Sequence, residues 1–216
     1  MAVSVAKQGY HLGHGEIDDH HDTVIYNETR DMRLLGFVLF LCADVILFSS
    51  FIFAYIYLRT TVSPVWPPIV DGKQLPRLDV AFACFNSVVL FGSGVTMHFA
   101  MEGWRHAKKR MFNLFMGLTI LLGAGFLGGQ GYEYMHARIG GWGGANGSIF
   151  GASFFTLTGM HGFHVFVGVC YLIILWLQVG RNVYTQDRYF GLTAGTLYWH
   201  FVDVIWVALF FLFYLW

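Results

Sequence analysis

Five long runs of apolar residues alternate with short polar stretches along the chain. Each run is longer than the roughly 20 residues with which an α-helix crosses the hydrocarbon core of a bilayer. The apolar residues are continuous instead of alternating, which excludes a transmembrane β-barrel as the main architecture. The pattern predicts an all-α integral membrane protein, a bundle of five transmembrane helices at about 34–58, 78–101, 112–136, 149–180 and 191–216.

A polar N-terminal tail, residues 1–33, precedes this single membrane domain of residues 34–216. The tail has no apolar run that would make it a signal peptide. It carries four histidines and three aspartates: His11, His14, His20, His21, Asp18, Asp19 and Asp22. These side chains would either bind a metal or belong to a loosely ordered, solvated tail. We favour the solvated tail because no periodic pattern fixes the ligands.

Composition narrows the class of protein further. Hydrophobic residues make up 56% of the chain and charged residues only 12%, against about 25% charged residues in soluble domains. The formal net charge is zero, so no basic surface for a nucleic-acid partner is expected. The three cysteines, Cys42, Cys84 and Cys170, lie in apolar runs without paired spacing. We interpret them as buried apolar residues and expect neither disulfides nor a zinc site.

Basic residues near the predicted membrane ends are distributed unequally between the two sides. Eight lie on the side of the N-terminal tail: Arg30, Arg33, Arg105, Lys108, Lys109, Arg110, Arg181 and Arg188. Four lie on the other side: Arg59, Lys73, Arg77 and Arg138. Because cytoplasmic loops are enriched in Lys and Arg, we expect a multi-pass protein of the cell membrane with its N-terminus in the cytoplasm and its C-terminus outside.

Asp44 is an ionisable residue deep inside the first predicted helix. It lies ten residues from the start of that helix, or about 15 Å at 1.5 Å per residue. An ionisable group at this depth costs about 2.5–3.5 kcal/mol on insertion scales. We therefore expect Asp44 to be protonated or paired with a buried donor such as His161 or His164. Two roles remain open: a neutral side chain hydrogen-bonded to a neighbouring helix, or a group that takes part in proton movement.

Pairs of ionisable residues recur at i, i+3 spacing in the later helices: Glu133 and His136, His161 and His164, His200 and Asp203. Glu-x-x-His is half of a di-iron pattern, but the second copy that such a site needs is missing. Haem ligation is disfavoured because His161 and His164 share one helix face and cannot grip opposite sides of a haem. We therefore expect no catalytic residue, no metal and no bound cofactor in this chain.

The remaining explanations for these groups are a polar network between helices or a docking role beside a partner that performs the chemistry. The candidate network comprises Asp44, His161, His164, Glu133, His200 and Asp203. A further signal is GAGFLGGQG at 123–131, whose five glycines would let another helix approach closely. A dihaem cytochrome or a transporter is the alternative class, and an optical spectrum of the purified chain would detect haem.

Several segments together resemble subunit III of the haem–copper terminal oxidases. They are RLLGFVLFLCADVILFSSFIFAYIYLR (33–59), GQGYEYMH (129–136), TGMHGFHVFVG (158–168) and LYWHFVDVIWVALFFLFYLW (197–216). The resemblance covers about residues 30–216 and is most specific in the fourth and fifth helices. With five predicted helices, the chain is similar to the short form of the family, which lacks the first two helices of the seven-helix form.

The resemblance implies a non-catalytic subunit of a proton-pumping oxidase that reduces O₂ to water. It implies subunits I and II as partners, which hold the haem and copper, and cytochrome c as a donor that acts on the complex. It also implies a V-shaped arrangement of helices with phospholipid in its cleft, stabilisation of subunit I and support of proton uptake. Asp44 matches the family's membrane-embedded carboxylate, and His161 and His164 are expected to fix the bundle through hydrogen bonds. A quinol oxidase subunit III and a nitric oxide reductase accessory protein remain as alternatives.

Overall fold

The structure is a computed structural model of the 216-residue chain. It describes the backbone of residues 18–62, 69–70, 73–74, 79–139, 149–181, 184 and 189–215. Side chains are described for residues 32–61, 79–136, 149–181, 184 and 189–215. The prediction of a solvated tail, with metal binding by its histidines as the alternative, therefore concerns side chains outside the described ones.

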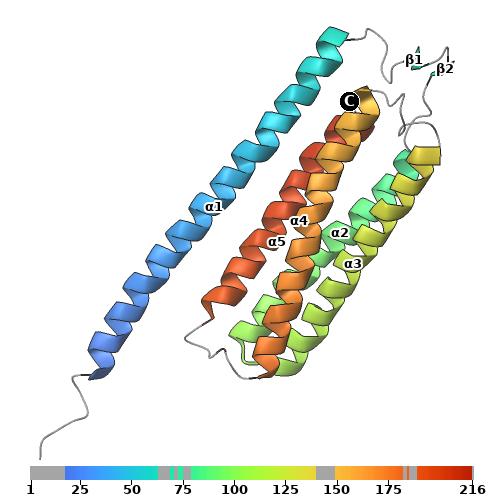
Figure 1. Cartoon of the computed structure of the whole chain (residues 1–216). Coiled ribbons are helices and arrows are strands. Elements are labelled where there is room, and N and C mark those ends of the chain that lie inside the picture. The colour runs from blue at the N-terminus through green and yellow to red at the C-terminus, as the bar shows by residue number, and fades with distance from the viewer. Residues whose placement is uncertain are drawn as a thin grey trace, which may run out of the picture. The chain divides into compact units, whose positions relative to one another are not determined.

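Five long helices account for most of the described backbone (Figure 1): α1 (Asp18–Val62), α2 (Val80–Arg105), α3 (Lys109–Ile139), α4 (Ile149–Gly180) and α5 (Phe190–Phe210). A short π-helix, η1 (Phe211–Leu215), continues α5. By length and composition, five helical stretches are able to cross a membrane: Met32–Thr61, Val80–Arg105, Lys109–His136, Ile149–Gly180 and Phe190–Leu215. The prediction of a helical architecture with five long apolar helices is confirmed for the described part of the chain.

Two local features differ from the sequence prediction. Helix α1 begins at Asp18 instead of near Leu34, so the described part of the predicted polar tail is helical. Residues 18–35 contain neither glycine nor proline, and nothing in their backbone chemistry ends the helix where the apolar run stops. A short antiparallel pair, β1 (Ile69–Val70) and β2 (Lys73–Gln74), lies between α1 and α2, with Ile69 opposite Gln74 and Val70 opposite Lys73.

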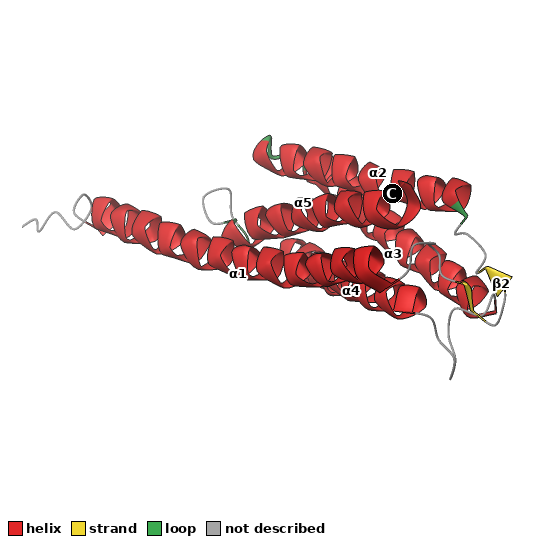
Figure 2. Ribbon diagram, turned by 90° about the horizontal axis from the view of Figure 1, so that it is seen from above, coloured by secondary structure: helices red, strands yellow, loops and turns green. Residues whose placement is uncertain are grey.

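The chain divides into two units, Met1–Leu39 and Phe40–Trp216. The first unit contains the N-terminal part of α1. In the second unit, α2 packs against α3, α3 against α4, α4 against α5, and α5 back against α2. These four helices form a closed ring, and Figures 1 and 2 show them running side by side. The part of α1 that belongs to this unit lies outside the ring and contacts α4 through Phe48 and His164.

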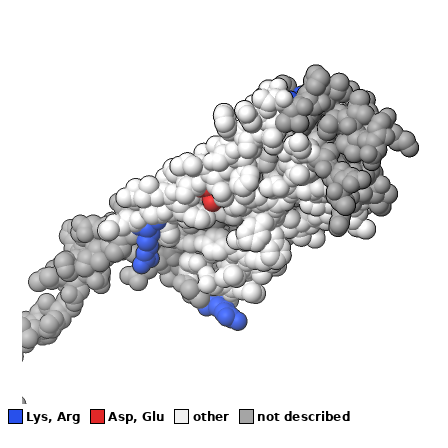
Figure 3. Space-filling model, turned by 45° about the horizontal axis from the view of Figure 1, so that its top comes forward, with Lys and Arg blue, Asp and Glu red and all other residues white. Residues whose placement is uncertain are grey.

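The outer surface of the helices is apolar, as a lipid-facing surface requires. Exposed side chains include Phe53 (71% exposed) on α1, Leu121 (67%) on α3 and Val204 (67%) on α5. On the face shown in Figure 3, most of the surface belongs to uncharged residues, and Lys and Arg lie along its margins. Because lipid tails are as apolar as these side chains, burial of apolar area does not by itself hold the helices together.

Trp199 of α5 marks one place where neighbouring helices approach closely. A Cβ atom added to Gly123 of α3 would lie 2.7 Å from the Trp199 ring, and one added to Gly168 of α4 would lie 2.9 Å from it. Gly129 is similarly close to Asn86 of α2, whereas a Cβ at Gly128 or Gly131 would meet nothing within 4 Å. The predicted role of the 123–131 glycines is confirmed for Gly123 and Gly129, which face neighbouring helices.

A tight turn joins α2 to α3 at the predicted cytoplasmic end. Ala107 adopts a left-handed backbone conformation (φ 56°). The Lys108 N–H donates to the Gly103 carbonyl at 2.8 Å, and the Ala107 N–H donates to the Trp104 carbonyl at 3.0 Å. This pair of bonds is the Schellman motif, which satisfies the last carbonyls of a helix. The basic residues of the segment WRHAKKR are therefore held at a sharp corner between two membrane spans.

Candidate functional site

The six polar residues of the predicted network lie in three separate places. Asp44 of α1 faces His164 of α4, with His161 one turn earlier on α4. His200 and Asp203 pair with each other on α5. Glu133 of α3 accepts a hydrogen bond from Tyr214 of η1 at 2.7 Å. Among the described residues, no hydrogen bond or ion pair links these three places to one another.

The Asp44–His164 pair joins α1 to the four-helix ring. The Asp44 Oδ1 atom lies 3.9 Å from His164 Nε2, and both side chains are largely buried, with 12% and 13% exposed. This distance is longer than a hydrogen bond but short enough for a strong electrostatic interaction in a medium of low dielectric constant. Phe48, one turn after Asp44, packs against the His164 ring with 5.1 Å between ring centroids.

The hydrogen bonds of His164 determine what it offers to Asp44. Its Nδ1 atom lies 2.8 Å from the carbonyl oxygen of Met160 on the same helix. Because a carbonyl only accepts, Nδ1 carries a proton, and Nε2 of the neutral ring is an acceptor that faces the carboxyl group. A protonated Asp44 carboxyl group would face this acceptor. Nδ1 bonds within α4, so Nε2 is the ring nitrogen of His164 that faces α1.

His161 differs from the sequence expectation. Its ring is fully buried, and neither nitrogen has a hydrogen-bond partner among the described residues. The ring instead stacks on Trp206 of α5 at 5.0 Å between centroids and meets Phe126 of α3 edge-on at 5.8 Å. The prediction that His161 fixes the bundle through a hydrogen bond is wrong in the described part of the chain. His161 joins three helices by packing as a flat aromatic ring.

His136 and His200 make their described polar contacts within their own helices. His136 lies within hydrogen-bond distance of the Tyr132 carbonyl on its own helix, 3.0 Å from Nδ1, and makes no described contact with Glu133. His200 Nδ1 lies 3.8 Å from Asp203 Oδ2. In the part of the chain with described side chains, no three His, Cys, Asp or Glu residues form a group that could hold a metal ion.

Hydrogen bonds between helices come mainly from residues that the sequence analysis did not single out. Every contact in the four-helix ring has at least one: Asn86 to Phe126 and Thr96 with Thr119 (α2–α3), Gln130 to Thr158 (α3–α4), Tyr198 to His164 (α4–α5), Trp199 to Ser93 and Trp206 to Ser87 (α2–α5). Each such bond contributes about 0.6 kcal/mol on average in membrane proteins. The signal in the sequence was the set of small polar residues inside apolar helices.

The comparisons with known proteins decide the family. A family model described as "Cytochrome c oxidase subunit III" matches residues 13–216. The chain belongs to the cytochrome c oxidase subunit III family. It is similar to proteins named "Cytochrome c oxidase subunit 3" from three distant organisms. It is 36% identical to that of Synechocystis sp. over 93% of this chain and 80% of the relative. It is 31% identical to the Arabidopsis thaliana protein over 95% of this chain and 75% of the relative. It is 34% identical to the Loxodonta africana protein over 94% of this chain and 75% of the relative.

Membership in the subunit III family settles the general role of the chain. It is a non-catalytic subunit of the oxidase complex, a multi-pass membrane protein that associates with other oxidase subunits. The geometry described above agrees with this role, since the described polar residues bind helices to one another. The Asp44–His164 pair is the part of this subunit III chain whose chemistry can be tested directly.

Infrared spectroscopy is expected to show that Asp44 and His164 share one proton. An isolated carboxylate in the membrane interior costs about 2.5–3.5 kcal/mol, so the neutral pair is favoured. The spectrum of Asp44→Asn should lose either a protonated-carboxyl band or a carboxylate band perturbed by the imidazolium. In His164→Phe the carboxyl group has no base beside it, and the protonated band should be present. Asp79→Asn, at the exposed N-cap of α2, is the matched control and should remove neither band. An Asp44 carboxylate band that is unchanged in His164→Phe would contradict the pairing.

Proposed function

We propose that this subunit III stabilises the catalytic subunit I, holds phospholipid and supports proton uptake in an oxidase that takes electrons from cytochrome c. The observation that carries the proposal is the closed ring of helices with hydrogen bonds at each contact. The described polar groups serve mainly to hold helices in place, as a scaffold beside subunits I and II requires. The six membrane residues predicted from the sequence are proposed as polar and proton-related positions, with Asp44 the foremost.

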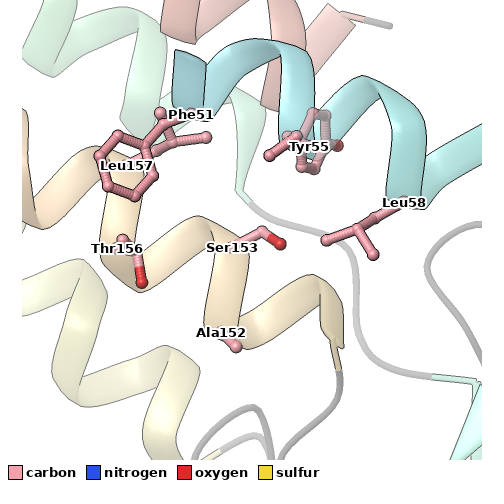
Figure 4. Close-up of a pocket in the computed structure, with 8 residues that line it drawn as sticks. Phe51, Tyr55, Leu58, Ala152, Ser153, Thr156 and Leu157 are labelled. Atoms are coloured by element: carbon pink, nitrogen blue, oxygen red, sulfur yellow. The ribbon is translucent and has the colours of Figure 1, made fainter. Parts of the chain in front are cut away.

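Lipid binding is supported by a groove between α1 and α4 (Figure 4). Its volume is about 220 Å³, and it is lined by Phe51, Ala54, Tyr55, Leu58, Ala152, Ser153, Thr156 and Leu157. Ala152, Phe51 and Leu157 line the groove in Figure 4, and the lining is mostly apolar. We propose that a phospholipid acyl chain occupies this groove. The V-shaped, lipid-filled cleft implied by the resemblance is part of the same proposal.

We propose a location in the cell membrane with the N-terminus in the cytoplasm. In a background with Cys42, Cys84 and Cys170 replaced, Lys108→Cys is expected to resist an impermeant thiol reagent in intact cells. The reason is the excess of basic residues on the side that includes the exposed corner at Lys108. Lys73→Cys, in the loop predicted to be outside, is the control and should be labelled. Labelling at position 108 together with protection at position 73 would reverse the orientation.

Co-purification tests the proposed assembly. A tagged chain, extracted in mild detergent, should bring down subunits I and II, identified by mass spectrometry. A subunit II with a copper site supports cytochrome c as the donor, and one without it would point to a quinol oxidase. A nitric oxide reductase among the co-purified proteins, with no oxidase subunit I, would refute the proposal.

A further inference from the structure

Exposed basic side chains gather at the corner between α2 and α3. Lys108, Lys109 and Arg110 follow one another there, and all three are exposed. Arg181, directly after α4, is exposed as well. The end of α4 lies at the same end of the bundle as the start of α3 (Figure 1), because Trp176 of α4 donates a hydrogen bond to α3 four residues after its start. We call these four basic residues the basic corner.

Apolar packing beneath the basic corner fixes its place on the surface. A Cβ atom at Gly103 would lie 2.9 Å from the backbone nitrogen of Phe112, so the glycine lets α3 begin directly against α2. The Trp104 ring meets the Phe112 ring edge-on at 5.5 Å between centroids, and both side chains are buried. Together with the hydrogen bonds of the turn, this packing holds the basic side chains at one position beside the membrane spans.

The positive charge of the corner is balanced on its α2 side only. Glu102 lies 4.0 Å from Arg105 and 3.2 Å from His106. The first turn of α3 contains no acidic residue, although the partial positive charge at a helix N-terminus favours acidic side chains there. Among the described residues, Lys108 and Arg110 form no ion pair with a protein carboxylate. The start of α3 therefore presents positive charge that an external anion would neutralise.

An exposed apolar stripe continues from the basic corner along α3. Leu114, Leu118 and Leu121 are 65%, 36% and 67% exposed. They follow Arg110 at helical spacing and share one face of α3 with it. From position 110 to position 121 the stripe is about 16 Å long at 1.5 Å per residue, close to half of the roughly 30 Å hydrocarbon core. A free phosphate or an acidic peptide would match the charges but not this stripe.

We propose that the basic corner and the leucine stripe of α3 bind an anionic phospholipid. Its phosphate contacts Lys108 and Arg110, and one acyl chain follows the stripe. Attraction between basic residues beside a membrane span and anionic headgroups provides the specificity for the lipid class. The inference extends the proposed lipid-holding role to a second surface, separate from the groove between α1 and α4. In the proposed orientation, this lipid belongs to the cytoplasmic leaflet.

Competition between two lipids tests the recognition of charge. The full chain is reconstituted in vesicles of equal parts phosphatidylglycerol and phosphatidylcholine and extracted in mild detergent. Native mass spectrometry then identifies the lipids that it retains, and phosphatidylglycerol should predominate. Lys108→Gln and Arg110→Gln should each lower this preference about 5-fold, the contribution expected of one basic residue near an anionic surface.

Two control variants separate local charge from a general effect. Arg110→Lys keeps the charge and should keep most of the preference, and Arg59→Gln, in the last turn of α1, should leave it unchanged. Equal retention of both lipids by the unmodified chain, or an unchanged preference in both glutamine variants at the corner, would overturn the inference. If the unmodified chain retains no phospholipid at all, the lipid-holding part of the proposed function is refuted instead.

Photo-crosslinking of the unmodified chain locates the lipid without any substitution. Phosphatidylglycerol with a photoreactive acyl chain is added to the reconstituted chain, and the adducts are mapped by peptide mass spectrometry. Adducts should concentrate in α3 between positions 114 and 121, and phosphatidylcholine with the same photoreactive chain should label this segment several-fold less. Equal labelling by the two lipids, or adducts only at the groove between α1 and α4, would contradict an anionic lipid at the basic corner.

Discussion

Replacing Trp199 with alanine is expected to lower the thermal unfolding temperature of the chain by about 10 °C. Trp199 is fully buried, and its Nε1 donates a hydrogen bond to Ser93 Oγ at 3.0 Å. Gly123 and Gly168 lie so close to its ring that neither position has room for a side chain. Loss of the side chain therefore leaves a cavity where α2, α3, α4 and α5 meet. Such core substitutions cost about 3–5 kcal/mol, and each kcal/mol corresponds to about 2–4 °C in a chain of this size.

A matched control for this prediction is Trp176→Ala. Trp176 is 38% exposed and donates a hydrogen bond to Asn113 at 3.2 Å between α4 and α3. Its loss should therefore lower the unfolding temperature much less, although the same residue type is removed. The measurement is circular dichroism of the detergent-solubilised chain during heating. Equal unfolding temperatures for the two variants would show that Trp199 does not hold the four helices together.

The helices were predictable from the sequence because a helix that crosses a membrane needs about 20 consecutive apolar residues. Helix α4 occupies Ile149–Gly180, as the apolar run indicates. The start of α1 was not predictable in this way. Its N-terminal part is polar, and a helix does not have to end where its apolar stretch does. The π-helix η1 was also missed, since a change from α to π hydrogen bonding within one apolar run has no signal in hydrophobicity.

The sequence predicted contacts in the candidate site only where two residues lie at the same depth in the membrane and no other information is needed. Asp44 and His164 were expected at compatible depths, and the structure places them 3.9 Å apart. Depth does not specify the rotation of a helix about its axis, which determines the neighbours of each side chain. His161 therefore stacks on Trp206, although the sequence suggested the same role for it as for His164. For the same reason Ser87 and Ser93 could not be identified as partners of the two tryptophans.

Removing the whole chain from the oxidase is expected to leave oxygen reduction possible but short-lived. Under the proposed function, the hydrogen-bonded helices and the apolar exterior act as a scaffold for subunit I, and the groove between α1 and α4 holds lipid. Its loss would expose apolar surface on subunit I and disturb the water and lipid near the site of proton uptake. The initial rate should fall modestly, and the number of turnovers before inactivation should fall several-fold. Trp199→Ala and His164→Ala should produce weaker forms of the same defect.

The most direct test of this account is a progress curve of oxygen consumption by the oxidase with and without the chain. The account predicts nearly parallel initial slopes, followed by early inactivation of the oxidase that lacks the chain. The difference should be larger at high pH, where protons are scarcer. Re-addition of the purified chain before turnover should restore the longer lifetime. An immediate and complete loss of oxygen consumption, with subunit I still folded and loaded with haem, would contradict the account and assign chemistry to this chain.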